Sequence, residues 1–345
     1  PVILKVKLTH KRELLIYYIR TMKKITIACL AMLTLNLACT PEEQVLTIGF
    51  GSCNEPNQTQ HLLPTLNKAL DSLDHFIWLG DNIYLKNGQW NSYDSTMARY
   101  NAVFGQSEFQ DLLNKSQHLA IWDDHDAGPN DCDLSTFTGF STTMSAFKDF
   151  WKPDYPQPNT QSYYGRKILA DGKVDIYLLD NRSFRTNKDS TNATVFGVEQ
   201  LNWFQNALNQ STAKVHIICM GGQLLNTAQV FENMSNYPTE RELLLQWLSK
   251  SPGQPIVLTG DRHSGEINKT VINGKSIIEI CASPLTANAH PHHNEINRTR
   301  IHKKTTDTQH FGVLQLKLSD SEEGRIEAGL YDSNGTVLFS FRETL

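Results

Sequence analysis

Several apolar segments of the sequence end in side chains that could do chemistry. The clearest case is Asp123-Asp124-His125-Asp126, where three carboxylates surround a histidine directly after an apolar stretch. Such a run makes a poor core and a costly helix cap, but it suits metal binding or acid–base chemistry. The other blocks with this placement are Gly51-Ser52-Cys53, Gly80-Asp81, Asp180-Asn181-Arg182 and Gly260-Asp261-Arg262-His263.

Taken singly, most of these blocks also have a structural interpretation. The Cys53 block could be a tight turn with a buried thiol, and Asp81 could cap a turn. Asp180-Asn181-Arg182 could be a turn with a surface ion pair, and His263 could be solvated. Their shared position favours function, because ligands of α/β proteins bind beyond the carboxyl ends of parallel strands. Many carboxylates at one sheet edge cannot all ionise without cations, so the sequence predicts a metal site.

Strand-like and helix-like segments alternate along most of the chain, which predicts an α/β fold with covered sheet faces. The expected strands are 45–50, 76–79, 119–122, 174–179, 215–220 and 256–258. The expected helices are 62–73, 92–104, 108–114, 144–150, 198–208 and 240–249. Late strands are expected at 275–281, 311–318, 325–331 and 337–341, with a hairpin turn at Asn334-Gly335. These late strands suggest a second sheet built mainly from them.

Two long polar stretches, 126–140 and 287–309, are expected to be loops beside the site. The second carries His290, His292 and His293, which we interpret as solvated or substrate-rim residues and not as ligands. The 345-residue chain is 39% hydrophobic, enough to bury a core, and its net charge of −4 gives no reason to expect nucleic-acid binding. Its oligomeric state stays open.

The segment 22–39 resembles a bacterial lipoprotein signal. Lys23 and Lys24 precede a short apolar run, which ends at Ala38-Cys39. We therefore expect export to the outer membrane, cell surface or periplasm of a bacterium, with Cys39 lipidated and the protein anchored to the membrane. The alternative is a plain secretory signal with a chance cysteine. On the lipoprotein interpretation, residues 1–21 are an upstream translated extension and 40–45 form a tether.

The ordered blocks resemble the alkaline phosphatase D family of metallophosphoesterases. The resemblance runs from about residue 46 to 318 and rests on GSC (51–53), GDNIY (80–84), WDDHD (122–126), LLDNRSFR (178–185) and LTGDRHSGE (258–266). It implies that 46–345 form one metallophosphoesterase domain. The implied fold is two packed mixed β-sheets flanked by helices, a four-layer α/β/β/α sandwich.

The resemblance also implies a mixed metal centre, similar to iron (Fe³⁺) with calcium or other divalent metals. Cys53 and Tyr84 would be anionic ligands to iron, and Asp81 would bridge metals. The remaining oxygen ligands would be Asp123, Asp124 and Asp261. The assignment of each ligand to an ion stays open.

The implied activity is hydrolysis of phosphate monoesters or diesters by metal-activated water. His125 and His263 are the candidate proton donors, and Arg182 would clamp a phosphate oxygen. Asn130 and Asp180 join Arg182 as expected substrate-binding residues. A phospholipase C-like phosphodiesterase on the same centre is the nearest alternative. A catalytically dead, surface-binding lipoprotein is a further one.

Overall fold

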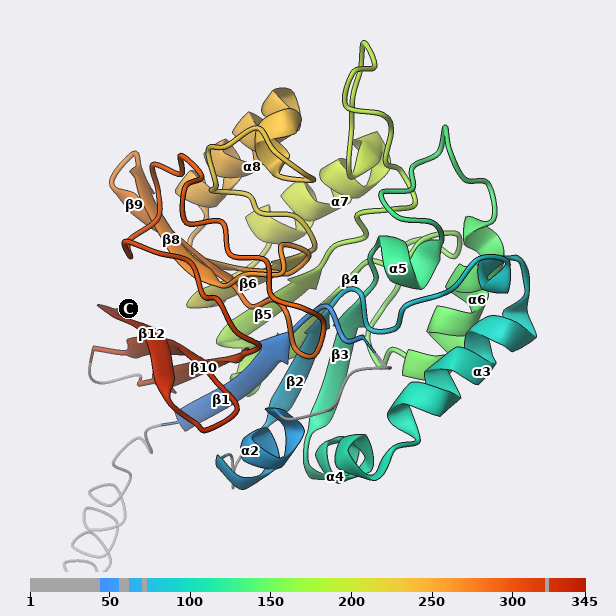
Figure 1. The fold of residues 1–345 in the computed structure, drawn as a ribbon. Helices are drawn as coiled ribbons and strands as arrows, with labels where there is room; N and C mark the ends of the chain where they lie inside the picture. The colour runs from blue at the N-terminus through green and yellow to red at the C-terminus, as the bar shows by residue number, and fades with distance from the viewer. Residues whose placement is uncertain (1–43, 56–61, 70–72, 320–322) are drawn as a thin grey trace, which may run out of the picture. The chain divides into compact units, whose positions relative to one another are not determined.

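Two six-stranded β-sheets form the centre of the computed structural model, which describes residues 44–55, 62–69, 73–319 and 323–345 (Figure 1). The first sheet has the order β12 (Val337–Thr344), β11 (Arg325–Tyr331), β10 (Phe311–Leu318), β1 (Gln44–Gly51), β2 (His75–Leu79), β3 (Gln117–Ile121). The second has the order β4 (Gly165–Leu169), β5 (Val174–Leu178), β6 (Val215–Met220), β7 (Gln254–Thr259), β9 (Lys275–Cys281), β8 (Glu266–Ile272).

Both sheets are mixed, and each contains a parallel block. Strands β1, β2 and β3 are parallel, while β10 pairs antiparallel with β1 in a register that joins Ile48 to Leu314. Strands β5, β6, β7 and β9 are parallel, with β4 and β8 antiparallel at the two edges. The parallel blocks matter for function, because parallel strands send their carboxyl ends to one edge of a sheet.

Helices flank the sheets and follow the strands of the parallel blocks. The helices of the described residues are α2 (Leu62–Ala69), α3 (Tyr93–Phe104), α4 (Ser107–Lys115), α5 (Asp124–Ala127), α6 (Phe140–Trp151), α7 (Gly197–Asn209) and α8 (Pro238–Lys250). Short 3₁₀ turns lie at η1 (Gln89–Asn91), η2 (Ala170–Gly172) and η3 (Met234–Asn236). In the described part of the chain, no helix combines the length and apolar character needed to cross a membrane.

Strands of the parallel blocks, such as β2, β5 and β6, are buried on both faces because their alternate residues enter different cores. In β2, Ile77 and Leu79 join the core between the sheets, which also holds Ile176 of β5. Phe76 and Trp78 of the same strand face the other way, into a core shared with α2, α3, α4 and α6. A third core joins the outer face of the second sheet to α7 and α8. The period-2 alternation of strands therefore explains three cores and four layers.

This arrangement confirms the predicted sandwich of two mixed sheets flanked by helices. The prediction that the late strands form most of a second sheet was wrong. Strands β10, β11 and β12 extend the first sheet through β1, whereas β8 and β9 belong to the second. The expected turn at Asn334-Gly335 joins β11 to β12, with Gly335 at a φ of +77°.

The predicted N-terminal extension, signal and lipidation residue lie outside the described residues. Strand β1 begins at Gln44, inside the predicted tether. The described cysteines are buried free thiols, namely Cys53, Cys132, Cys219 and Cys281.

Candidate metal centre

The segments that follow β2, β3, β6, β7 and β9 meet at a cavity of about 490 Å³, so both sheets contribute to it. The cavity is lined by Asp81, Asp124, His125, Asn130, Asp131, Phe231, Glu232, Asp261, Arg262, His263, His290 and His292. Cys53 and Asp123 lie buried beside these residues. The structure therefore brings together most of the side chains that the sequence singled out at strand ends.

Four of these residues adopt a backbone conformation that side chains disfavour. Cys53, Asp81, Asp261 and His263 have φ between +51° and +64°. Such left-handed backbone costs about 1–3 kcal/mol per non-glycine residue and tends to occur at functional sites. The turn at Asp81 is held by the Asn54 amide, which donates to the Asp81 carbonyl at 2.8 Å. Strain at four residues after three strands, β1, β2 and β7, indicates that the cavity geometry is imposed by the fold.

Glycine permits the close approach of the strand ends. Gly80 has a φ of +90°, and a Cβ there would lie 2.6 Å from the Asp123 Cβ. A Cβ at Gly221, just after β6, would collide with the Asp123 Oδ2. A side chain at either position would therefore displace Asp123.

Cys53, Asp81 and His263 form the first donor group, in which one ligand atom from each lies within 4.8 Å of the others. The Cys53 Sγ is 3.5 Å from the Asp81 Oδ2, and the Tyr84 hydroxyl is 3.4 Å from the same oxygen. The Tyr84 hydroxyl also lies 3.2 Å from the His263 Nε2. Ser283 donates to the Cys53 sulfur at 3.1 Å. The first donor group thus offers sulfur, carboxylate, imidazole and phenol ligands around one point.

Asp81, Asp124 and His125 form the second donor group, with ligand atoms again within 4.8 Å. The His125 amide donates to the Asp81 Oδ1 at 3.3 Å, and the Asp131 amide donates to the Asp124 Oδ2 at 2.7 Å. The His125 ring stacks on Tyr84 with centroids 4.2 Å apart. Asp81 belongs to both donor groups, so its two oxygens can serve neighbouring cations.

The electrostatics of the cluster disfavour the ionised forms of Asp81 and Asp261 in the absence of cations. Burial, followed by the charges of Asp124 and Cys53, raises the pKa of Asp81 well above its usual value. Burial, followed by Glu232 and Asp123, does the same to the pKa of Asp261. Burial alone would lower the pKa of His263, but the adjacent Cys53 raises it to about 9. Concentrated negative charge of this kind is relieved by bound metal ions.

Unpartnered oxygens provide a test of whether metals fit. The Asp123 Oδ2 and the Asp124 Oδ1 are buried without a hydrogen-bond partner, and the Asp124 Oδ1 has the Arg182 guanidinium as an ion-pair partner at 3.7 Å. Buried polar atoms in proteins nearly always have partners, so orphaned carboxylate oxygens here call for one. Carboxylates suit hard cations, whereas thiolate and imidazole suit transition metals. The residues present therefore fit a centre with more than one kind of metal.

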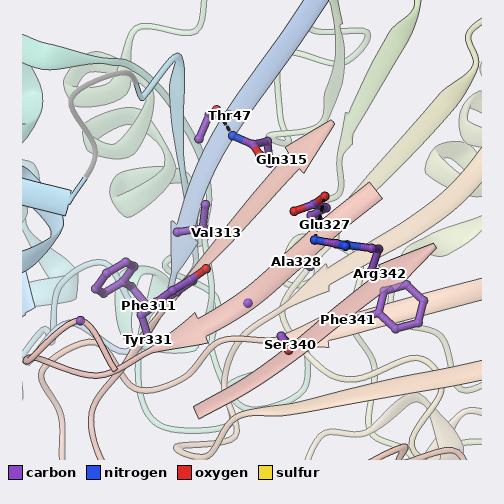
Figure 2. Close-up of a pocket in the computed structure, with 12 residues that line it drawn as sticks. Thr47, Phe311, Val313, Gln315, Glu327, Ala328, Tyr331, Ser340, Phe341 and Arg342 are labelled. Atoms are coloured by element: carbon purple, nitrogen blue, oxygen red, sulfur yellow. Dashed lines mark hydrogen bonds and ion pairs between the residues drawn. The ribbon is translucent and has the colours of Figure 1, made fainter. Parts of the chain in front are cut away.

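A second hollow, of about 470 Å³, lies on the face formed by β1, β10, β11 and β12 (Figure 2). Figure 2 shows the rings of Phe311 and Tyr331 at one end and Arg342 near Glu327 at the other. Among the described residues that line it, the carboxylate is Glu327, which pairs with Arg342 at 3.2 Å. The side chains that could bind metals or transfer protons are thus concentrated in the first cavity.

The comparison with known families agrees with this site. The model of the PhoD-like phosphatase family matches residues 50–328, a range that includes both donor groups. The chain belongs to the PhoD-like phosphatase family. The predicted resemblance is thereby confirmed.

Individual relatives of this family are distant in sequence. Alkaline phosphatase D of Bacillus subtilis (strain 168) is 25% identical over 273 residues, which cover 64% of this chain and 46% of that protein. The chain therefore spans about half the length of this relative. A solved structure of PhoD matches with a TM-score of 0.68 at 16% identity, covering 86% of this chain and 72% of that one. The latter match supports the fold. A 5'-nucleotidase precursor from Thermus thermophilus is also similar, with a TM-score of 0.42 at 12% identity, over 88% of this chain and 54% of that one.

Glu232 is a buried residue of this site that the sequence did not single out. It forms ion pairs with Arg182 and with Arg185, the latter at 2.9 Å. Arg182 is fully buried, bonds Asp123 and donates to the Cys132 carbonyl at 3.1 Å. Glu232 follows no strand directly and belongs to no short motif, so local sequence carried no signal for it. The Arg182 guanidinium is therefore bonded to buried protein groups, namely Glu232, Asp123 and the Cys132 carbonyl.

We expect Arg182→Met to destabilise the metal-depleted protein by about 3–5 kcal/mol, because it leaves buried carboxylates uncompensated. Urea denaturation of the purified variant measures this loss. Arg342→Met is the matched control: Arg342 also pairs with a glutamate but is exposed, so its loss should change stability by less than about 1 kcal/mol. Equal stability of the two variants would contradict the importance of the buried network.

The two other expected substrate-binding residues occupy different positions. Asn130 lines the cavity. Asp180 is fully buried, and its carboxylate accepts bonds from Trp122 Nε1 at 2.6 Å and from the Tyr163 amide at 2.8 Å. It also accepts from the backbone amides of Arg182 and Ser183 and from the Ser183 hydroxyl. The structure thus brings Asn130, but not Asp180, into the lining of the cavity.

Proposed function

We propose that the chain hydrolyses phosphate esters at a polynuclear metal centre. The observation that carries this proposal is the sharing of Asp81 by two donor groups on one cavity. Membership of the PhoD-like phosphatase family supports it. The chain spans about half of its relative's length, so its substrate and partners are proposals of their own and are not taken over from the relative.

Cys53, Tyr84 and Asp81 are proposed to hold a trivalent iron. Asp81 would be shared with a calcium or other divalent ion held by Asp124, and Asp123 and Asp261 would add further oxygen ligands. The metals would neutralise phosphate charge and activate the attacking water. The strained turns at Cys53 and Asp81 support this role, because they keep the ligands preorganised.

His263 is proposed to donate a proton to the departing oxygen. Its Nδ1 bonds the Asn288 carbonyl at 2.8 Å, which fixes the ring and leaves Nε2 on the Tyr84 side. His125 lines the same cavity and is proposed to steady the phosphate. Asn130 lines the cavity and is proposed to donate to a phosphate oxygen, whereas Arg182 is proposed to act by holding Asp123 in position.

Metal analysis combined with two assays tests the proposed function. Purified protein should contain bound metal and hydrolyse a simple phosphate monoester, a diester, or both. Chelation should abolish the activity, and added iron with calcium should restore it. The ratio of the two rates decides between a phosphomonoesterase and a phospholipase C-like phosphodiesterase. Metal-replete protein that hydrolyses neither ester would overturn the proposal and favour a surface-binding role.

Export as a lipoprotein is proposed from the sequence at 22–39. Cys39→Ser should move the protein from the membrane fraction to the soluble fraction, because it removes the lipidated thiol. Fractionation followed by immunodetection measures this change. Wild-type protein that is already soluble would contradict the anchor.

A further inference from the structure

Phe231 is an exposed aromatic residue of the cavity that the proposed hydrolysis does not use. It is 66% exposed, the highest value among the aromatic residues that the structure describes. It lines the same cavity as Asp81 and Asp124. Its φ is +47°, a conformation that bulky residues rarely adopt outside functional or constrained sites.

The backbone around Phe231 is held by side-chain amides of its own loop. Asn236 donates to the Phe231 carbonyl at 2.7 Å, and Asn233 donates to the Ala228 carbonyl at 3.0 Å. The Met234 amide donates to the Gln223 carbonyl at 2.9 Å, which ties the loop to the segment after β6. A ring presented on a fixed loop loses little conformational entropy when a ligand packs on it.

One face of the Phe231 ring is already occupied by a buried cation. The Arg262 guanidinium carbon lies 5.0 Å from the ring centroid, and the His292 ring lies 5.1 Å away at 49°. Arg262 is held by Glu295 at 2.5 Å and by Asn233 at 2.7 Å, so it does not leave the ring. Arg262 and His292 therefore leave most of the Phe231 side chain exposed, at a position that lines the cavity.

We propose that Phe231 is a stacking platform for the leaving group, so that the site prefers phosphate esters with a planar aromatic group next to the phosphate. This specificity rests on the proposed phosphoesterase function. The donor groups would hold the phosphate, and the aromatic group would pack on the open face of Phe231. A cavity of about 490 Å³ is large enough for a phosphate and one ring system.

Matched substrates and variants test the platform. Phenyl phosphate and ethyl phosphate are compared in wild type, Phe231→Leu, Phe231→Trp and Val271→Ala, the last removing an exposed apolar residue that does not line the cavity. Phe231→Leu should lower the phenyl-over-ethyl preference in kcat/KM about five- to tenfold, mainly through KM. Phe231→Trp should retain the preference. The intrinsic difference between the leaving groups cancels, because each variant is compared with wild type on the same ester.

Binding without turnover separates this inference from the proposed function. Calorimetry with phenylphosphonate and methylphosphonate, which are not hydrolysed, should give the same loss of aromatic preference in Phe231→Leu. That result supports the platform even for a protein that turns over neither ester, in which case the proposed function alone fails. Equal effects of Phe231→Leu on both phosphonates and on both esters would overturn the platform and leave the phosphoesterase proposal intact.

Discussion

Asp81→Asn should remove bound metal and lower phosphate-ester turnover by more than about 100-fold, a larger loss than is usual for residues that merely support metal ligands. Asp81 is the residue common to both donor groups, so its replacement affects two cation positions together. An amide keeps the shape of the carboxylate but loses the negative charge that a bridging ligand needs. Elemental analysis and steady-state kinetics of the variant measure the two losses.

The same substitution should not weaken the metal-free fold. Burial and the charges of Asp124 and Cys53 raise the pKa of Asp81, which means that its ionised form is costly in the folded protein. For a carboxyl with a raised folded pKa, stability falls as pH rises above the unfolded pKa of about 3.9. Asn removes that penalty, so chelator-treated Asp81→Asn should be at least as stable as chelator-treated wild type at neutral pH.

Asp175→Asn supplies the control for Asp81→Asn. Asp175 is equally buried but lies away from the cavity, paired with Arg166 at 3.2 Å. Its replacement should lower stability and leave the metal content unchanged. If Asp81→Asn instead retained full metal and normal turnover, Asp81 could not be the shared ligand.

Much of the fold was predictable because its strands carry buried apolar runs that end in turn residues. Strands such as β6 and β9 were placed with their observed bounds, since each contains a run of β-branched residues with clear borders. Strand β4 was missed because Gly165–Leu169 is short and carries two cations. Strand β8 was missed because its first residue, Glu266, closes a polar motif. Edge strands have one open side, so their sequences give a weaker apolar signal.

The division of the late strands between the sheets could not be read from sequence. Strand β10 is apolar and could pair with any exposed edge, yet it pairs with β1, far away in the chain. Long-range pairing of this kind depends on which edges remain free once the parallel blocks have formed. The local sequence pattern indicates that a strand exists, but it does not indicate which strand it pairs with.

The site was predictable where chemistry and strand ends coincide. Cys53, Asp81 and Asp124 each lie two or three residues after a strand, so the topology brings them together. Glu232 and Phe231 escaped notice because they lie in an irregular loop that reaches the cavity through tertiary packing. A lone glutamate or phenylalanine in a loop has many structural explanations and no spacing to set it apart.

Tyr84→Phe should remove the visible colour of iron-loaded protein and lower turnover about 10- to 100-fold. The Tyr84 hydroxyl lies 3.4 Å from the Asp81 Oδ2 and 3.2 Å from the His263 Nε2, at the centre of the first donor group. Burial, followed by the charges of Cys53 and Asp81, raises the pKa of Tyr84 well above its usual value of about 10. The phenol is therefore neutral in metal-free protein, and only a strongly charged cation would draw off its proton.

A visible band should consequently appear on iron loading, disappear on chelation and be missing from Tyr84→Phe. Cys53→Ser should shift or weaken the band, because it replaces a soft thiolate by a poorer ligand. Tyr331→Phe, in the hollow shown in Figure 2, is the control and should leave the spectrum unchanged. Phenylalanine retains the stacking of position 84 on His125, at 4.2 Å in the wild type, so the fold should survive the change. A fully active wild-type enzyme without iron would defeat the iron assignment, while the phosphoesterase proposal would stand on the carboxylates alone.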